Sequence, residues 1–197
     1  MSPRPTYNCI ENRIVISNKP TILIKGPYMN LKTRSLLLLQ NTRFLTLATQ
    51  GNDQLPWAST VEHCVKLNPL RFIWFSSRQA KHSKNIQQNE KISGSLFNHS
   101  LPEMLKSGLD GMQFTGKARE LTDAECEEAL EEFYPQSPFD EISPSFTQVN
   151  LNALRSNGHS RFYEMTVDHL WMFDIKSWED KQESRRVTVP ISLLSNK

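Results

Sequence analysis

The feature that most constrains the fold is a series of short runs rich in β-branched and aromatic residues. Three such runs cover residues 43–49, 56–66 and 70–76, and turn residues at 50–53 and 68–69 separate them. Runs this short, at hairpin spacing, predict antiparallel strands, and the strand–helix–strand rhythm of a doubly wound sheet is absent. The third run is apolar on both faces, as expected for a barrel strand that packs inside and is covered outside.

Three segments predict short helices. Residues 31–41 carry leucines on one side, and residues 77–89 form a polar segment that we expect to begin at Ser77 as N-cap. Thr122 and Glu125 have the spacing of a capping box, which predicts a third helix up to about Phe133. These helices would lie against the barrel rather than form a layer of their own.

Further strands are predicted after the second helix. Residues 91–97 read as a strand in which Gly94 marks a bulge or a close backbone approach. Residues 112–121 alternate between apolar and polar side chains, and residues 161–175 supply one or two final strands. The charged segment after Trp178 is expected to be loosely held.

The chain therefore predicts an α+β fold, an antiparallel split β-barrel with flanking helices. We expect an N-terminal extension at 1–29, one domain at 30–178 and a C-terminal tail at 179–197. The N-terminal part, with its β-branched patches, could form a hairpin or an extended arm, and residues 135–160 are rich in Pro, Ser and Asn.

Composition narrows the classes of function. The 23 basic and 21 acidic residues give a net charge of +2, which offers no support for nucleic-acid or membrane-surface binding. The longest apolar run, Leu36–Leu39, is far shorter than a membrane helix needs. The three cysteines, Cys9, Cys64 and Cys126, are widely spaced and predict free thiols in a reducing, cytoplasmic setting.

The histidines give no metal-ligand spacing. His63, His99, His159 and His169 are scattered along the chain, so no metal site is predicted. His63 ends the second strand, where it could lie near a bound ligand or be a half-exposed strand residue.

The segment 75–85 has the composition of an anion site. A strand ends in Ser76 and Ser77 and is followed by a helix that carries Lys81 and His82. Hydroxyl groups and free N–H groups at a helix start can donate to phosphate oxygens, and basic side chains add charge-assisted donors. The alternative is a solvated helix with a serine cap.

Five segments together resemble one known family. Residues 75–85 resemble the phosphate-binding segment of the FMN-binding split β-barrel family of pyridoxamine-5′-phosphate-oxidase-like proteins. Residues 43–49, 55–61, 89–93 and 111–118 resemble other strands of that family, in the family's order. The resemblance covers about residues 31–135 and rests on the ordered set rather than on any one motif.

The resemblance implies roles for individual residues. Ser76, Lys81 and His82 would hold the FMN phosphate, and Ser77 could assist. Four residues of the second strand would run beside the isoalloxazine: Ala58, Ser59, Thr60 and Val61. The side chain of Gln113, on the late strand, would approach the flavin. Gln113 could equally be a surface strand residue, and the stretch 58–61 plain barrel packing.

The family also implies a function. We expect an FMN-dependent oxidoreductase that acts on a small molecule, as a homodimer with FMN at the subunit interface. The arginine-containing C-terminal signature of the vitamin B6 oxidases is absent, because Arg185 and Arg186 lack its context, and the basic residue that those oxidases carry at the start of the second strand is also missing. One alternative is a non-catalytic flavin- or haem-binding module, such as a flavin carrier or sensor, or a split barrel that has lost its cofactor and serves as an interaction domain. Another is a barrel that holds haem or a deazaflavin.

Overall fold

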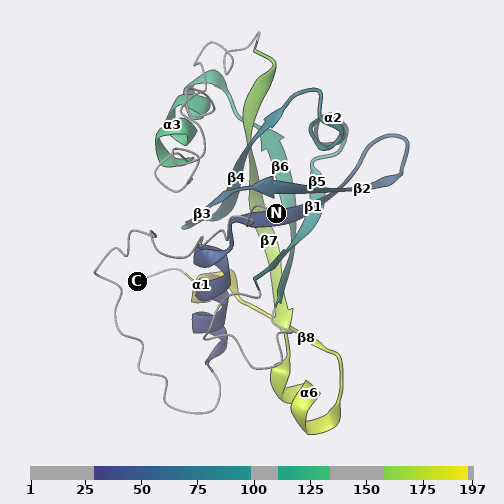
Figure 1. The fold of residues 1–197 in the computed structure, drawn as a ribbon, viewed down its shortest axis with the longest axis vertical. Helices are drawn as coiled ribbons and strands as arrows, with labels where there is room; N and C mark the ends of the chain where they lie inside the picture. The colour runs from purple at the N-terminus through teal and green to yellow at the C-terminus, as the bar shows by residue number, and fades with distance from the viewer. Residues whose placement is uncertain (1–28, 99–110, 134–157, 195–197) are drawn as a thin grey trace, which may run out of the picture.

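The computed structural model describes residues 29–98, 111–133 and 158–194, which form one curled antiparallel sheet with attached helices (Figure 1). Neighbouring strands follow the order β2-β1-β5-β6-β7-β4-β3, and β8 pairs with β7. The strands are β1 (Phe44–Gln50), β2 (Pro56–Glu62), β3 (Cys64–Leu67), β4 (Leu70–Ser77), β5 (Lys91–Phe97), β6 (Gly111–Glu120), β7 (Ser160–Phe173) and β8 (Arg186–Thr188). The predicted α+β split barrel is confirmed.

The helices also lie close to their predicted positions. They are α1 (Leu31–Asn41), α2 (Lys81–Gln88), α3 (Asp123–Phe133), α6 (Ile175–Lys181) and the short 3-10 helix η3 (Ile191–Leu193). The capping box is present, because the Thr122 backbone N–H donates to Glu125 Oε2 at 2.8 Å while the Glu125 N–H reaches Thr122 Oγ1 at 3.4 Å. The prediction that Ser77 caps α2 is wrong, because α2 begins after Ala80 and Ser77 belongs to β4.

The concave side of the sheet encloses the main core. β1 alternates strictly, so Leu45 and Leu47 are buried while Thr46 and Ala48, which follow them, are exposed. Helix α1 closes this core, because its Leu38 and Leu39 side chains pack in the same cluster. A second, smaller cluster under α3 covers the other side of β4, as the two apolar faces of that strand predict.

Two glycines mark close backbone approaches. A Cβ at Gly94 would lie 2.5 Å from the carbonyl oxygen of Thr46 on β1, which confirms a close approach. A Cβ at Gly116 would lie 2.0 Å from the carbonyl oxygen of Thr166, at the point where the register between β6 and β7 shifts. This bulge leaves Asp168 without a direct partner on β6.

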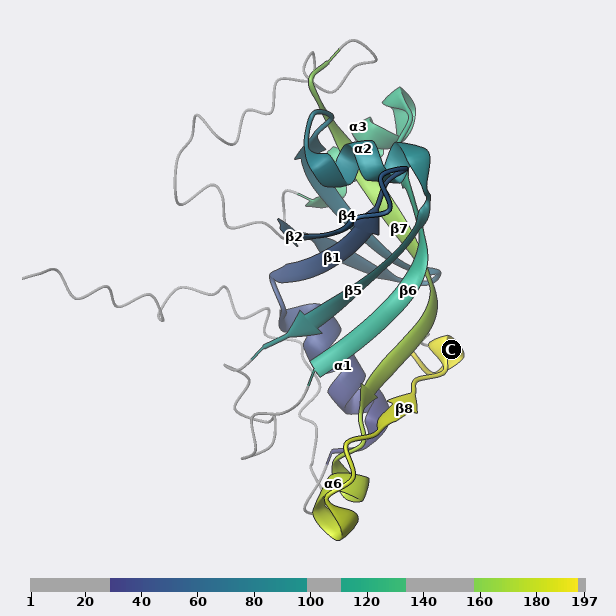
Figure 2. The same ribbon diagram turned by 90° about the vertical axis from the view of Figure 1, so that its right-hand side faces the viewer.

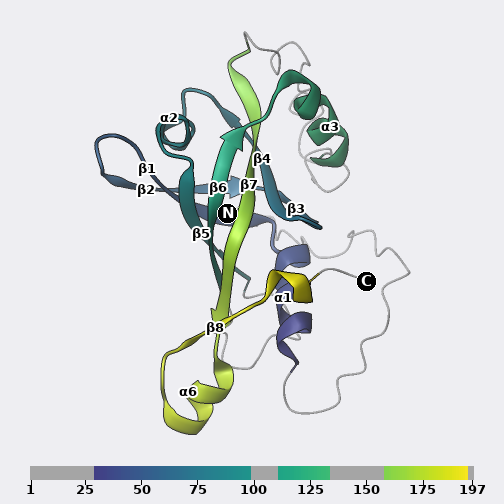
Figure 3. The ribbon, with the colours of Figure 1, turned by 180° about the vertical axis from the view of Figure 1, so that it is seen from behind.

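The C-terminal segment packs against the domain (Figure 3). β8 pairs with β7, and the side chains of Val189 and Leu194 are buried in the main core beside the leucines of α1. The expectation of a loosely held segment after Trp178 is therefore wrong for residues 186–194, whereas residues 179–185 are exposed. The predicted extension at 1–29 and the segment 135–160 fall almost wholly outside the described residues.

The convex face of β1, β5 and β6 carries no helix in the described part of the chain (Figure 2). Phe44 and Phe97 are 48% and 56% exposed there, on neighbouring strands. Within the described ranges, none of the helices has the length and apolar character needed to cross a membrane.

Candidate functional site: a histidine held between two serines

Helix α2 sits at one end of the barrel and brings β2 and β4 together through one side chain. The Nε2 atom of His82 lies 2.8 Å from Ser76 Oγ on β4, and its Nδ1 atom lies 3.1 Å from Ser59 Oγ on β2. His82 is 8% exposed, and its burial lowers the pKa of the imidazole. Three residues that the sequence assigned to cofactor binding are therefore in direct contact.

Ser77 is engaged by the turn that leads into α2. Its hydroxyl accepts a hydrogen bond from the Gln79 N–H at 3.1 Å, and its carbonyl accepts one from the Ser83 hydroxyl at 2.8 Å. The Arg78 guanidinium anchors the same turn by pairing with Glu120 at 2.6 Å. Ser77 thus shapes the turn next to the Ser59–His82–Ser76 contact.

Lys81 points to the turn between β1 and β2. Its ammonium group lies 2.5 Å from Asp53 Oδ2, and this contact lowers the pKa of the Asp53 carboxyl group. The Asn52 N–H of the same turn donates to Gln88 Oε1 at 2.7 Å, so both ends of α2 hold the hairpin. The predicted phosphate ligand Lys81 therefore has an internal carboxylate partner.

Residues 58–61 alternate between the two faces of β2. Ala58 and Thr60 are exposed on the convex face, whereas Val61 is buried in the core and Ser59 reaches His82. Among the described strands β2 pairs only with β1. Its other edge therefore leaves backbone donors and acceptors free beside α2.

Gln113 lies elsewhere in the chain. It is on β6, opposite Ser95, and its Oε1 accepts a hydrogen bond from Arg186 Nε at 2.7 Å. β1 and β5 lie between β6 and β2. Within one chain, Gln113 is thus not brought to the Ser59–His82–Ser76 contact.

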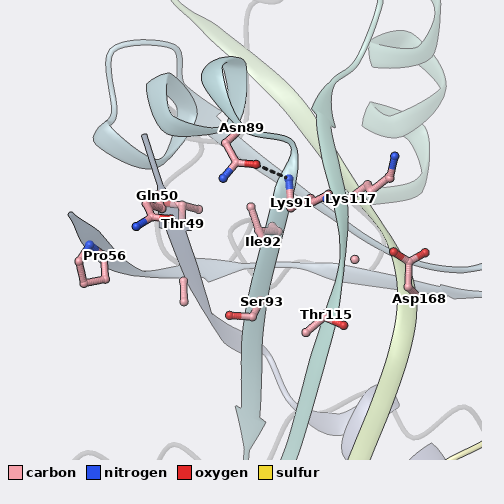
Figure 4. Close-up of a pocket in the computed structure, with 12 residues that line it drawn as sticks. Thr49, Gln50, Pro56, Asn89, Lys91, Ile92, Ser93, Thr115, Lys117 and Asp168 are labelled. Carbon is pink, nitrogen blue, oxygen red and sulfur yellow. Dashed lines mark hydrogen bonds between the residues drawn. The ribbon is translucent and has the colours of Figure 1, made fainter. Parts of the chain in front are cut away.

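An open depression on the convex face was not found from the sequence (Figure 4). It has a volume of about 450 Å³ and contains none of the predicted cofactor residues. Its residues are Ala48, Thr49, Gln50, Pro56, Asn89, Lys91, Ile92, Ser93, Thr115, Gly116, Lys117 and Asp168. The alternation of 112–121 places Thr115 and Lys117 on the outer face, but the contribution of Asp168 depends on the bulge at Gly116.

One of the two expectations for His63, a half-exposed strand residue, is wrong. It is 8% exposed and lies edge-on to Phe72, with 5.2 Å between the ring centroids. Burial lowers the pKa of His63 to about 4. It is part of the packing between β2 and β3.

Comparison with known proteins decides the family. The sequence profile described as Pyridoxamine 5'-phosphate oxidase matches residues 32–170, which is most of the chain. The chain belongs to the pyridoxamine 5′-phosphate oxidase family. A curated relative, the UPF0306 protein PM1958 of Pasteurella multocida (strain Pm70), is 31% identical over 84 residues. That alignment covers 43% of this chain and 54% of the relative, so the chain matches about half of that relative's length.

Solved structures share the fold of this family member at low identity. A heme binding protein from Mycobacterium smegmatis superposes with a TM-score of 0.59 and 14% identity, over 84% of this chain and 60% of the other. A protein from Clostridium acetobutylicum related to general stress protein 26 of B. subtilis gives a TM-score of 0.58 and 12% identity, over 83% and 96%. HutZ, a heme storage protein from Vibrio cholerae, superposes with a TM-score of 0.51 and 15% identity, over 72% of this chain and 94% of HutZ. At these identities the likeness concerns the fold.

Proposed function

We propose that this family member is an FMN-dependent oxidoreductase that acts on a small molecule as a homodimer. The observation that carries the proposal is the contact of Ser59 and Ser76 with His82 at the free edge of β2. Family membership supplies the expectation of a flavin, and this contact lies where the sequence resemblance expects the cofactor's phosphate and ring.

The groups present fit a phosphorylated flavin. Ser59 and Ser76 are partly exposed, and their hydroxyls can donate to phosphate oxygens, while Lys81 stands at the start of α2 with its side chain 40% exposed. The free edge of β2 offers backbone N–H and C=O groups to the polar rim of an isoalloxazine ring. Asp53 opposes an anion here, because its carboxylate holds Lys81.

The flavin would carry the redox step, and the chain would bind, orient and shield it. We assign phosphate binding to Ser59, Ser76 and Lys81. Ser77 would shape the turn that flanks them. Thr60 and Ala58 would lie beside the ring on the exposed side of β2. Gln113 would approach a flavin only from the second subunit, because β1 and β5 separate it from the site of its own chain.

The proposed dimer uses the convex face of the sheet. That face carries the exposed rings of Phe44 and Phe97 and is not covered by a described helix. A cofactor groove between two subunits is also consistent with the absence of the predicted residues from the lining of the depression in Figure 4. We place the protein in the cytoplasm, in keeping with the buried thiols of Cys64 and Cys126.

The test compares FMN with riboflavin, which lacks the phosphate. Titration of each flavin into the purified, flavin-free protein should give tighter binding of FMN. Ser76→Ala should weaken FMN binding about tenfold or more, since hydrogen bonds to charged groups contribute about 1.5–3 kcal/mol. It should leave riboflavin binding unchanged, so a general loss of stability is distinguished from loss of the phosphate contact.

Two controls complete the test. Ser192→Ala, at an exposed position on η3, should bind both flavins like the unchanged protein. Bound flavin should then be reduced by a reduced nicotinamide and reoxidised by an acceptor in repeated turnover. Equal affinity for FMN and riboflavin in the unchanged protein would refute the phosphate site, and bound FMN without turnover would favour a carrier or sensor.

Haem binding is the second candidate. Two structures with this fold are described as a heme binding protein and a heme storage protein. His169 is exposed on β7, with its ring 5.7 Å from that of Trp171, and could reach an iron atom. A Soret band in the protein as purified, lost in His169→Ala, would replace the flavin proposal with this one.

A further inference from the structure

Both ring nitrogens of His82 are occupied by serine hydroxyls from different strands. The Nε2 contact to Ser76 is 2.8 Å and the Nδ1 contact to Ser59 is 3.1 Å. His82 itself is 8% exposed, whereas both serines are partly exposed. A ligand can therefore reach the hydroxyls more readily than it can reach the imidazole between them.

The protonation state of His82 decides what the two hydroxyls can donate. A neutral imidazole has one N–H and one lone pair, so one serine accepts from the ring and the other must give its proton to the ring. Only the first serine then has a proton left for a ligand. A protonated imidazole donates from both nitrogens, so both serines accept from it and both hydroxyl protons are free.

The surroundings keep His82 neutral near pH 7 when no anion is bound. Burial lowers the pKa of His82 below its ordinary value of 6.5. β1, the strand most extensively packed on α2, has no ionisable side chain.

The charged groups on the other elements around α2 are mostly paired with one another. The pairs are Lys81 with Asp53, Glu62 with Arg43, Lys117 with Glu90, Arg119 with Glu125, and Glu120 with Arg78. Lys84, on α2 itself, is exposed. A dianion at the two serines would be the strongest charge next to the ring, and it favours the imidazolium.

We infer that His82 is a positioning residue that couples phosphate binding to proton uptake. The inference rests on the proposed function. A phosphate dianion that accepts hydrogen bonds from Ser59 and Ser76 draws one proton from solvent onto the imidazole lone pair. The hydroxyl proton that had pointed to this lone pair turns to a phosphate oxygen, so the bound state holds one more proton in total. His82 thereby selects a phosphorylated ligand over its dephosphorylated form.

The test measures protons exchanged on binding. FMN is titrated calorimetrically into the flavin-free protein at pH 7, in buffers of different ionisation enthalpy. The unchanged protein should take up about one proton more per FMN than His82→Gln does, because the glutamine amide keeps a donor and an acceptor but does not titrate. FMN's own phosphate ionises near pH 6 in both titrations, so the difference between the proteins removes its contribution.

Riboflavin and pH supply the internal controls. Riboflavin should bind to both proteins with equal proton exchange. The preference for FMN over riboflavin should rise as pH falls below 7 in the unchanged protein, by at most about tenfold per pH unit for one coupled proton, and be flatter in His82→Gln. Lys176→Gln, at an exposed position on α6, should behave like the unchanged protein.

A direct observation of the ring covers the case in which His82→Gln folds poorly. Nitrogen-15 resonances of the His82 ring in the unchanged protein should change from the neutral to the imidazolium pattern when FMN is added. Equal proton uptake in the two proteins, or a His82 ring that stays neutral with FMN bound, overturns the inference and leaves the proposed function standing. Failure of the unchanged protein to bind FMN overturns both.

Discussion

His63 is a buried histidine whose charge the fold excludes. It packs edge-on against Phe72, and burial lowers its pKa to about 4 from the ordinary 6.5. Above pH 6.5 His63 is neutral in both the folded and the unfolded chain, so its titration costs no stability there. As pH falls from 6.5 to about 4, the unfolded chain binds a proton that the folded chain does not, and stability is lost over this window.

The free energy of unfolding should therefore fall by about 3 kcal/mol between pH 7 and pH 4 through His63 alone. Urea denaturation at a series of pH values measures it. His63→Phe should flatten this part of the curve, whereas His169→Gln, at an exposed position, should leave it unchanged. A curve for His63→Phe as steep as that of the unchanged protein would show that His63 is not the group responsible.

Asp53 is an internal competitor for an anionic ligand. Its carboxylate holds the ammonium of Lys81 at 2.5 Å, so a phosphate that recruits Lys81 must displace it. Both side chains are substantially exposed, at 40% and 39%, and such pairs contribute little in water. Asp53→Asn should accordingly raise the affinity for FMN by about two- to fivefold.

The same substitution should not change the affinity for riboflavin. The asparagine keeps an oxygen that can accept from the Leu55 N–H, as Asp53 Oδ1 does at 3.2 Å, so the turn is retained. Asp180→Asn on α6 removes an equal charge far along the chain and serves as control. An unchanged or weaker affinity for FMN would mean that Lys81 does not contact the phosphate.

At the scale of elements, a charged network joins the turn before α2 to β6, β7 and α3. Glu120 on β6 accepts from Arg78 at 2.6 Å and from the Tyr163 hydroxyl at 3.2 Å, and it lies 3.4 Å from Arg161 Nε. Arg161 is 3% exposed and also pairs with Asp123 at the start of α3. The network fixes the turn that presents Ser76 and Ser77.

Glu120→Ala should cost about 3 kcal/mol of unfolding free energy, because it removes a carboxylate from a buried arginine. Chemical denaturation gives the value. Glu127→Ala on the exposed side of α3 is the matched control and should change stability by less than about 0.5 kcal/mol. If the two variants were equally stable, Asp123 and the nearby backbone carbonyls would suffice for Arg161.

The elements could be predicted from the sequence to the extent that they depend on local signals. The alternation of 112–121, the capping box at Thr122 and the apolar faces of β4 are short-range patterns, and each has its expected structure. The pairing of Lys81 with Asp53 spans 28 residues and follows from how the hairpin folds over α2, which no local pattern encodes.

The burial of residues after β7 was missed for a related reason. Val189 is 1% exposed and Leu194 is fully buried, and both belong to the run 187–194, in which apolar residues alternate with Thr188, Pro190 and Ser192. This run is short and contains Pro190, so only the tertiary fold reveals that its apolar residues complete the core next to α1. The burial of His82 could not be predicted from the sequence either, because it depends on the approach of β2 to β4.

At the scale of the whole molecule, the uncovered convex face predicts association. Phe44 and Phe97 lie on adjacent strands and expose about half of their surfaces, which is unusual for large apolar side chains unless a partner covers them. Phe97→Asp should convert the proposed dimer to a monomer at micromolar concentration, as measured by size exclusion with light scattering. Ser192→Asp, which adds the same charge on η3, should leave the dimer intact. A monomeric unchanged protein would refute the dimer.

Dimerisation and flavin binding should then depend on each other. If residues of the second subunit complete the site, Phe97→Asp weakens FMN binding although Ser59, Ser76 and His82 are unchanged. The loss should be recovered as protein concentration rises, because mass action restores the dimer and the dimer binds FMN. Titrations of FMN at a series of protein concentrations measure this coupling, with the monomer fraction determined at each one. A fully monomeric variant that binds FMN as tightly as the dimer would show that the contact of Ser59, His82 and Ser76 is a complete site in one chain.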